Sequence, residues 1–204
     1  MLAIYKRELK SYMHSFIGFL FIGVTLFFVG LYFVSNNIFG AYPYFSYTVS
    51  SAVFIFMISV PILTMRSLSE ERKTKTDQLI LTAPISVGKI VMGKYLALVS
   101  IFAVAVLITC TYPLIMSQFG TVPMGEAYLA ILAFFLYGST CIAIGVFVSS
   151  LTESPVIAAV IGFGLLFLGY MMTGICSMVS NELLVKILCC YDLYTPFVNV
   201  LEGT

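Results

Sequence analysis

Five long apolar runs constrain the fold of this 204-residue chain more than any other feature. A helix needs about 20 largely apolar residues to cross the roughly 30 Å hydrocarbon core of a membrane, because each residue rises about 1.5 Å. The runs that meet this length cover residues 16–35, 47–65, 87–115, 127–149 and 155–176. The sequence therefore predicts an all-α, polytopic membrane helix bundle that forms one transmembrane domain over residues 1–204.

Composition supports this class and excludes several functions. The chain is 61% hydrophobic and 9% charged, whereas about a quarter of the residues in a soluble domain are charged. Ten basic against nine acidic residues leave no basic face for nucleic acid. With His14 as its single histidine and five cysteines without a CxxC pair, the chain offers no metal site. We expect no catalytic residue and no cofactor on this chain.

Basic residues predict how the spans are oriented. Lys6, Arg7 and Lys10 precede the first run, and six more basic residues lie between Arg66 and Lys94. Nine of the ten Lys and Arg residues thus lie on one side, which the positive-inside rule assigns to the cytoplasm. We expect a multi-pass protein of the plasma (inner) membrane with a cytoplasmic N-terminus.

Two further segments flank the five runs. Residues 1–15 carry apolar and aromatic side chains at helical spacing with basic side chains opposite, which predicts an interfacial helix. A merely basic flank of the first span remains the alternative. Residues 177–204 hold Lys186 and Asp192 where a span needs apolar side chains. We expect short amphipathic half-helices on the outer side there, and no sixth span in this sequence.

The spans carry no Asp, Glu, Lys or Arg at mid-depth. Ion-coupled carriers usually need such a group, so a secondary transporter is disfavoured. The stretch GKIVMGKY, residues 88–95, fits the start of a phosphate-binding loop but has Tyr95 where that loop needs Ser or Thr. Its lysines, Lys89 and Lys94, are expected to snorkel to the cytoplasmic headgroups.

Residues 66–86 form a charged cytoplasmic loop. Ser67 and Glu70 have the spacing of a capping box, and Glu71 with Lys75 has that of a favourable i,i+4 pair. These patterns predict that the second span continues as a helix to about Lys75.

A second, shorter helix is expected within the same loop. Thr76 can cap it, Asp77 suits its N-terminus, and Pro84 ends it. It carries three apolar side chains, and leaving each in water forgoes about 1.5–3 kcal/mol. Something is therefore expected to cover Leu79, Ile80 and Leu81: the membrane surface, the chain's own helix ends, or a groove on a cytoplasmic partner.

Small residues and one proline supply packing and bending. Ala158 with Gly162, and Gly145 with Ser149, are small-xxx-small pairs that allow close helix approach, within the chain or between copies. Pro61 lacks a donor within the second span and is expected to act as a hinge there.

Two stretches resemble a known family. EERKTKTDQLILTAPIS, followed by IVMGKYLA, is similar to the loop between spans two and three of type-2 ABC transporter permeases, especially the gliding-motility and nitrous-oxide-reductase maturation branch. AIGVFVSSLTESPVIAAVIGFG, residues 143–164, resembles that family's fourth span, short cytoplasmic turn and fifth span. The family expects a sixth span, which we do not find in this sequence.

The resemblance implies a coupling helix that docks on a separate cytoplasmic ABC ATPase subunit, with Glu70 and Glu71 beside that contact. ATP and magnesium would bind the ATPase, and a second permease copy or paralogue would complete the export path through the lipid. The coupling residues implied are Glu70, Glu71, Thr76, Asp77, Gln78, Leu79, Ile80, Leu81, Thr82, Ala83 and Pro84.

Two other functions stay open from the residues alone. One is a non-transporting membrane anchor or sensor that uses the same loop to hold a cytoplasmic partner. The other is an autonomous channel or carrier. Phe, Met, Ser and Thr in the spans are compatible with lipids, hydrophobic peptides or drugs as cargo and do not identify one.

Overall fold

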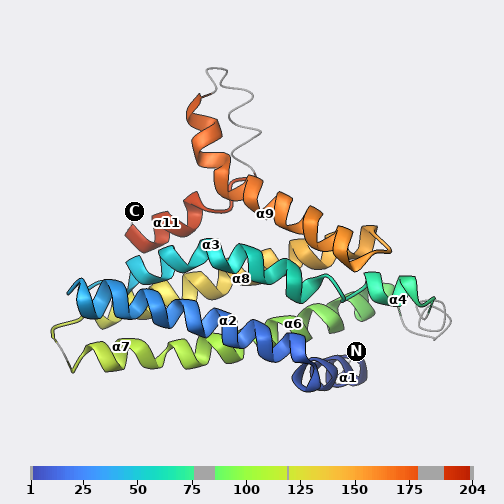
Figure 1. The fold of residues 1–204 in the computed structure, drawn as a ribbon, viewed down its shortest axis with the longest axis horizontal. Helices are drawn as coiled ribbons and strands as arrows, with labels where there is room; N and C mark the ends of the chain where they lie inside the picture. The colour runs from blue at the N-terminus through green and yellow to red at the C-terminus, as the bar shows by residue number, and fades with distance from the viewer. Residues whose placement is uncertain (1, 76–85, 119, 179–190, 203–204) are drawn as a thin grey trace.

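The computed structural model describes residues 2–75, 86–118, 120–178 and 191–202 (Figure 1). The regular elements within these ranges are all helical. In chain order they are α1 (Leu2–His14), α2 (Phe16–Tyr32), the π-helix η1 (Phe33–Phe39), α3 (Phe45–Thr64), α4 (Ser69–Lys73), α6 (Val87–Thr109), α7 (Thr111–Met116), α8 (Met124–Leu151), α9 (Pro155–Met178) and α11 (Thr195–Glu202).

Among the described residues, five helical segments are long and apolar enough to cross a membrane. They are Phe16–Phe39, Phe45–Lys73, Val87–Met116, Met124–Leu151 and Pro155–Met172. Each corresponds to one of the five apolar runs of the sequence. The predicted all-α, polytopic membrane helix bundle is confirmed.

Aromatic side chains from four spans form the centre of the bundle. The ring of Phe56 on α3 lies 4.8 Å from that of Phe102 on α6 and 5.1 Å from that of Phe134 on α8, while Phe21 on α2 lies 6.0 Å from Phe56. Gly138 on α8 makes room for this cluster, since a Cβ there would overlap the Phe102 ring. The four helices therefore approach closely at mid-bundle, where apolar burial and ring contacts stabilise them.

The spans contain breaks that the apolar runs do not indicate. The first span ends in seven residues of π-helix, and Phe33 at its start stacks on Tyr112 of α7 at 4.9 Å. The third span is divided into α6 and α7 at Cys110. Both breaks lie beside the stacked rings of Phe33 and Tyr112, so a contact between the first and third spans accompanies each break.

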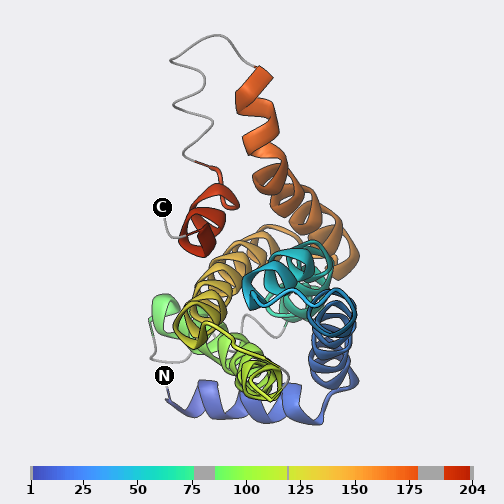
Figure 2. The same cartoon turned by 90° about the vertical axis from the view of Figure 1, so that its left-hand side faces the viewer.

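The N-terminal helix α1 lies across the bundle rather than along it. Figure 2 shows it beside α6, with the long spans seen nearly end-on. It lies at the same end of the molecule as α4 and the turn between α8 and α9 (Figure 1). We call this end the charged end. A position on a membrane surface stays a prediction for α1, and its orientation across the spans fits that prediction.

The last described residues fold back onto the spans. Asp192 accepts hydrogen bonds from the backbone N–H groups of Tyr194 and Thr195, both at 3.0 Å, at the start of α11. The Tyr194 hydroxyl then contacts the Ser50 hydroxyl on α3 at 3.0 Å. Asp192, which the sequence marks as an obstacle to crossing, thus holds the backbone at the start of a short helix. Of the expected outer half-helices over 177–204, residues 179–190 lie outside the described part of the chain.

Candidate functional site

The candidate site is the junction at the charged end where α3 gives way to α4. The sequence predicts a helix that runs without interruption to Lys75. In the structure α3 ends at Thr64, residues 65–68 are not helical, and α4 ends at Lys73. Lys75 has a left-handed φ of 55°. The predicted continuous helix is wrong, and with it the i,i+4 register expected for Glu71 and Lys75.

The predicted capping box is also wrong, because the cap comes from another helix. Leu68 occupies the N-cap position of α4 without a side-chain cap. The Ser149 hydroxyl on α8 accepts hydrogen bonds from the backbone N–H groups of Leu68 and Ser69, both at 3.1 Å, and it donates to the Met65 carbonyl at 3.2 Å. A fully buried hydroxyl thus satisfies backbone groups that the helix break leaves open.

Both small-residue pairs pack against this part of the same chain. Gly145 faces Thr64, whose side chain a Cβ would overlap. A Cβ on Gly162 of α9 would lie 3.6 Å from the Cβ of Pro61. The pairs therefore let α8 and α9 approach the end of α3, which is the intrachain alternative of the two that the sequence allows.

Pro61 does not end α3 in the structure. It lies buried inside α3, and the backbone N–H of Met65 donates to its carbonyl at 2.9 Å. The helix ends three residues later, at Thr64. A hinge role for Pro61 stays a prediction.

Lys94 on α6 is the most unusual side chain of the site, with 2% of it exposed. Its Nζ donates to Glu71 of α4 at 2.8 Å, to the Ser67 carbonyl at 2.8 Å and to Glu8 of α1 at 3.4 Å. The prediction that Lys94 snorkels to the headgroups is wrong, because these acceptors hold the ammonium inside the protein. Lys89, five residues earlier, is exposed, and its snorkelling to the headgroups stays a prediction.

The two glutamates of α4 face different ways. Glu71 points inward, and 19% of its side chain is exposed. Glu70 is 49% exposed and lies 3.7 Å from Arg66 on the outer surface. Of the two positions that the resemblance places beside an ATPase contact, Glu70 is thus open to solvent while Glu71 belongs to the interior of the site.

Helix α1 contributes the remaining charges. Arg7 lies 2.7 Å from Glu8 and 3.4 Å from Glu71. Burial raises the pKa of the Tyr12 phenol above its ordinary value, and the Glu8 carboxylate adds to the shift, so Tyr12 is a neutral hydroxyl at physiological pH. A polar cavity of about 680 Å³ lies between α1, the start of α4 and α6, with Arg7, Glu8, Arg66, Glu70, Glu71 and Lys94 among its lining residues.

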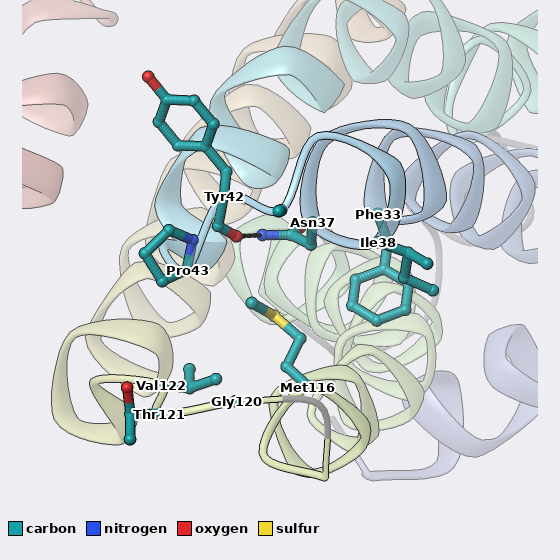
Figure 3. A pocket seen from close by; sticks show the side chains of 10 residues that line it. Phe33, Asn37, Ile38, Tyr42, Pro43, Met116, Gly120, Thr121 and Val122 are labelled. Carbon is teal, nitrogen blue, oxygen red and sulfur yellow. Dashed lines mark hydrogen bonds between the residues drawn. The ribbon is translucent and has the colours of Figure 1, made fainter.

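A second cavity (Figure 3) is lined by η1, α7 and the turns that follow them, which lie at the end of the bundle opposite the charged end in Figure 1. It measures about 460 Å³, and its ten lining residues carry no charge. Asn37 reaches across it, but its amide donates to the carbonyls of Tyr42 at 2.8 Å and Tyr44 at 3.2 Å. This amide therefore holds the turn after η1 in place.

The remaining predicted site residues, Thr76 to Pro84, lie outside the described residues. Sequence reasoning missed Glu8, Lys94 and Ser149. A signal existed for two of them: Lys94 is four residues from both Ile90 and Leu98, which are buried, and Glu8 falls between Tyr5 and Tyr12 on one helix face. Ser149 gave no such signal, because its partners are about 80 residues away.

Comparison with protein-family models identifies the family of this chain. The five-span helical bundle is a multi-pass membrane protein. A family model described as ABC-2 family transporter protein matches residues 40–202, most of the chain. The chain therefore belongs to the ABC-2 transporter family, whose members form the membrane permease part of ABC transporters. Neither a curated protein nor a solved structure matched the chain.

Proposed function

We propose that this chain is the membrane-spanning permease subunit of an ATP-binding cassette exporter. The observation that carries the proposal is the family match over residues 40–202. In this role the chain has no catalytic residue. A separate cytoplasmic ATPase subunit binds ATP and magnesium, and a second permease copy or paralogue completes the path for an unidentified substrate. The branch that includes gliding-motility and nitrous-oxide-reductase maturation permeases remains the proposed relationship within the family.

The charged end supports a coupling role for the loop. Residues 76–85 follow two residues after the end of α4 in the sequence, and α4 is fixed to the bundle by Ser149 of α8 and Lys94 of α6. A force applied to the loop by a partner would reach three helices at once. We propose that Thr76 to Ala83 form the coupling helix, that the charged end faces the cytoplasm, and that the protein lies in the plasma membrane.

Co-purification in mild detergent tests the proposal. Wild-type chain is expressed with candidate ABC ATPases and compared with Leu79→Asp and Leu81→Asp. A carboxylate on the apolar face of a docked helix would be buried without a partner, so both variants are expected to lose the ATPase.

Ser86→Asp is the matched control. It adds the same charge just outside the proposed helix, at the N-cap of α6, where Asp is a favoured residue. Ser86→Asp is expected to retain the ATPase. Wild type that captures no ATPase, or aspartate variants that capture it as well as wild type does, would contradict the proposal.

A further inference from the structure

Lys94 on α6 joins two segments that are far apart in the sequence, α1 and the stretch from Ser67 to Glu71. Its acceptors are Glu8 on α1, the Ser67 carbonyl in the break before α4, and Glu71 on α4. An ammonium has three N–H donors, and here one acceptor lies on α1 while the other two lie in the stretch from Ser67 to Glu71. We propose that Lys94 is a positioning residue that clamps α1 and α4 onto α6, so that the N-terminal helix moves together with the loop that follows α4.

Burial makes the loss of one partner more costly here than in the exposed ion pairs of the site. Removing one partner of a buried pair leaves an uncompensated charge away from water, which is strongly destabilising. The Lys94 side chain is 2% exposed, and those of Glu8 and Glu71 are 12% and 19% exposed. The Arg66–Glu70 pair is about half exposed on both sides, and exposed pairs contribute little. Glu71, which pairs with the buried Lys94, and Glu70, which pairs with the exposed Arg66, are neighbours on α4. They therefore allow a matched comparison of a buried and an exposed ion pair.

Helix α1 contacts α6 at a second point besides Lys94. Besides Glu8, the Tyr5 hydroxyl lies 2.9 Å from the Ser100 hydroxyl on α6, so α1 is held along α6 at two points. Arg7, 59% exposed, adds a solvent-facing contact to Glu71. If Lys94 holds these contacts together, α1 moves with α4 when a partner moves the loop that follows α4. This extension to transport rests on the proposed function.

Hydrogen exchange on the purified chain in detergent tests the clamp without any ATPase. Glu8→Gln is expected to raise amide exchange in α1 and to leave α4 unchanged. Glu71→Gln is expected to raise it in α4 and to leave α1 largely unchanged. Lys94→Met is expected to raise it in both helices, by about tenfold or more. Glu70→Gln, the exposed control, is expected to leave both helices within about twofold of wild type.

The double variant Glu71→Gln/Lys94→Met separates pairing from a general loss of packing. If the two residues act through each other, exchange in α4 is no faster in the double variant than in Lys94→Met alone. Unchanged exchange in α1 and α4 of Lys94→Met, or additive effects in the double variant, would overturn the proposal. If Lys94→Met does not fold, the two glutamine variants still decide, because wild-type exchange in α1 of Glu8→Gln and in α4 of Glu71→Gln would contradict the clamp.

A second readout uses the complex with the ATPase. Lys94→Met leaves the loop sequence intact, so it is expected to retain ATPase capture while export per ATP hydrolysed falls severalfold. Unchanged coupling in Lys94→Met would overturn the role in transport. Wild type that captures no ATPase would refute the proposed function instead, and the exchange experiment would still report on the clamp.

Discussion

Single side chains from distant parts of the chain hold the charged end together. Ser149 illustrates this, because one hydroxyl accepts two backbone hydrogen bonds at the start of α4 and donates a third. A buried backbone N–H without a partner is costly, so the identity of this residue matters more than its small size suggests. Gly145, which is also on α8, matters for steric reasons, because a larger side chain there would overlap Thr64.

Ser149→Ala is expected to destabilise the chain by about 1–3 kcal/mol, because it leaves the N–H groups of Leu68 and Ser69 unsatisfied. Unfolding in mixed micelles measures the change. Ser150→Ala is the control, since that hydroxyl is exposed and donates within its own helix, to the Phe147 carbonyl. Equal effects of the two substitutions would rule out the cap.

Two glycine substitutions are expected to act in opposite directions. Gly145→Ala forces a methyl group into the Thr64 side chain and should cost about 1–3 kcal/mol in the same unfolding assay. Gly164→Ala has nothing within 4 Å of its new methyl group and replaces a poor helix former, so it should be neutral or stabilising by up to about 1 kcal/mol. A harmless Gly145→Ala would show that α8 does not pack closely on Thr64.

At the scale of elements, the apolar runs of the sequence predict the spans well and their interruptions poorly. Predicted starts at residues 16, 87 and 155 agree with α2, α6 and α9. The break at residues 65–68 depends instead on Ser149 and Lys94, which come from α8 and α6. Hydropathy and local capping patterns cannot report such contacts, so the sequence located the charged loop but misassigned the residues that fix it.

Pro61 allows a test of how α3 transmits motion. The proline lacks an N–H, so Pro61→Ala restores a donor within the helix and should stiffen it. The packing of Gly162 is expected to change little, because alanine keeps the Cβ of Pro61 that Gly162 faces. We expect export per ATP hydrolysed to fall severalfold while ATPase capture is retained, measured in proteoliposomes. If both coupled ATPase activity and export stay at wild-type levels, Pro61 is not a hinge.

At the scale of the whole molecule, charge is distributed between the two ends in a way that fits a one-sided partner. The charged end carries α4, the ion pairs of Lys94 with Glu8 and Glu71, and the start of the loop. The cavity at the opposite end has uncharged walls. A coupling loop and a clamp on α1 can serve an ATPase only if the charged end lies in the cytoplasm. The orientation of the bundle is therefore the requirement on which the whole account depends.

Cysteine labelling in intact cells measures this orientation most directly. Single cysteines are placed at exposed positions, Lys73→Cys at the charged end and Thr121→Cys at the other, in a variant whose five native cysteines are replaced by serine. The proposed orientation predicts that a membrane-impermeant maleimide labels Thr121→Cys in intact cells and Lys73→Cys only after permeabilisation. Labelling of Lys73→Cys in intact cells would contradict it.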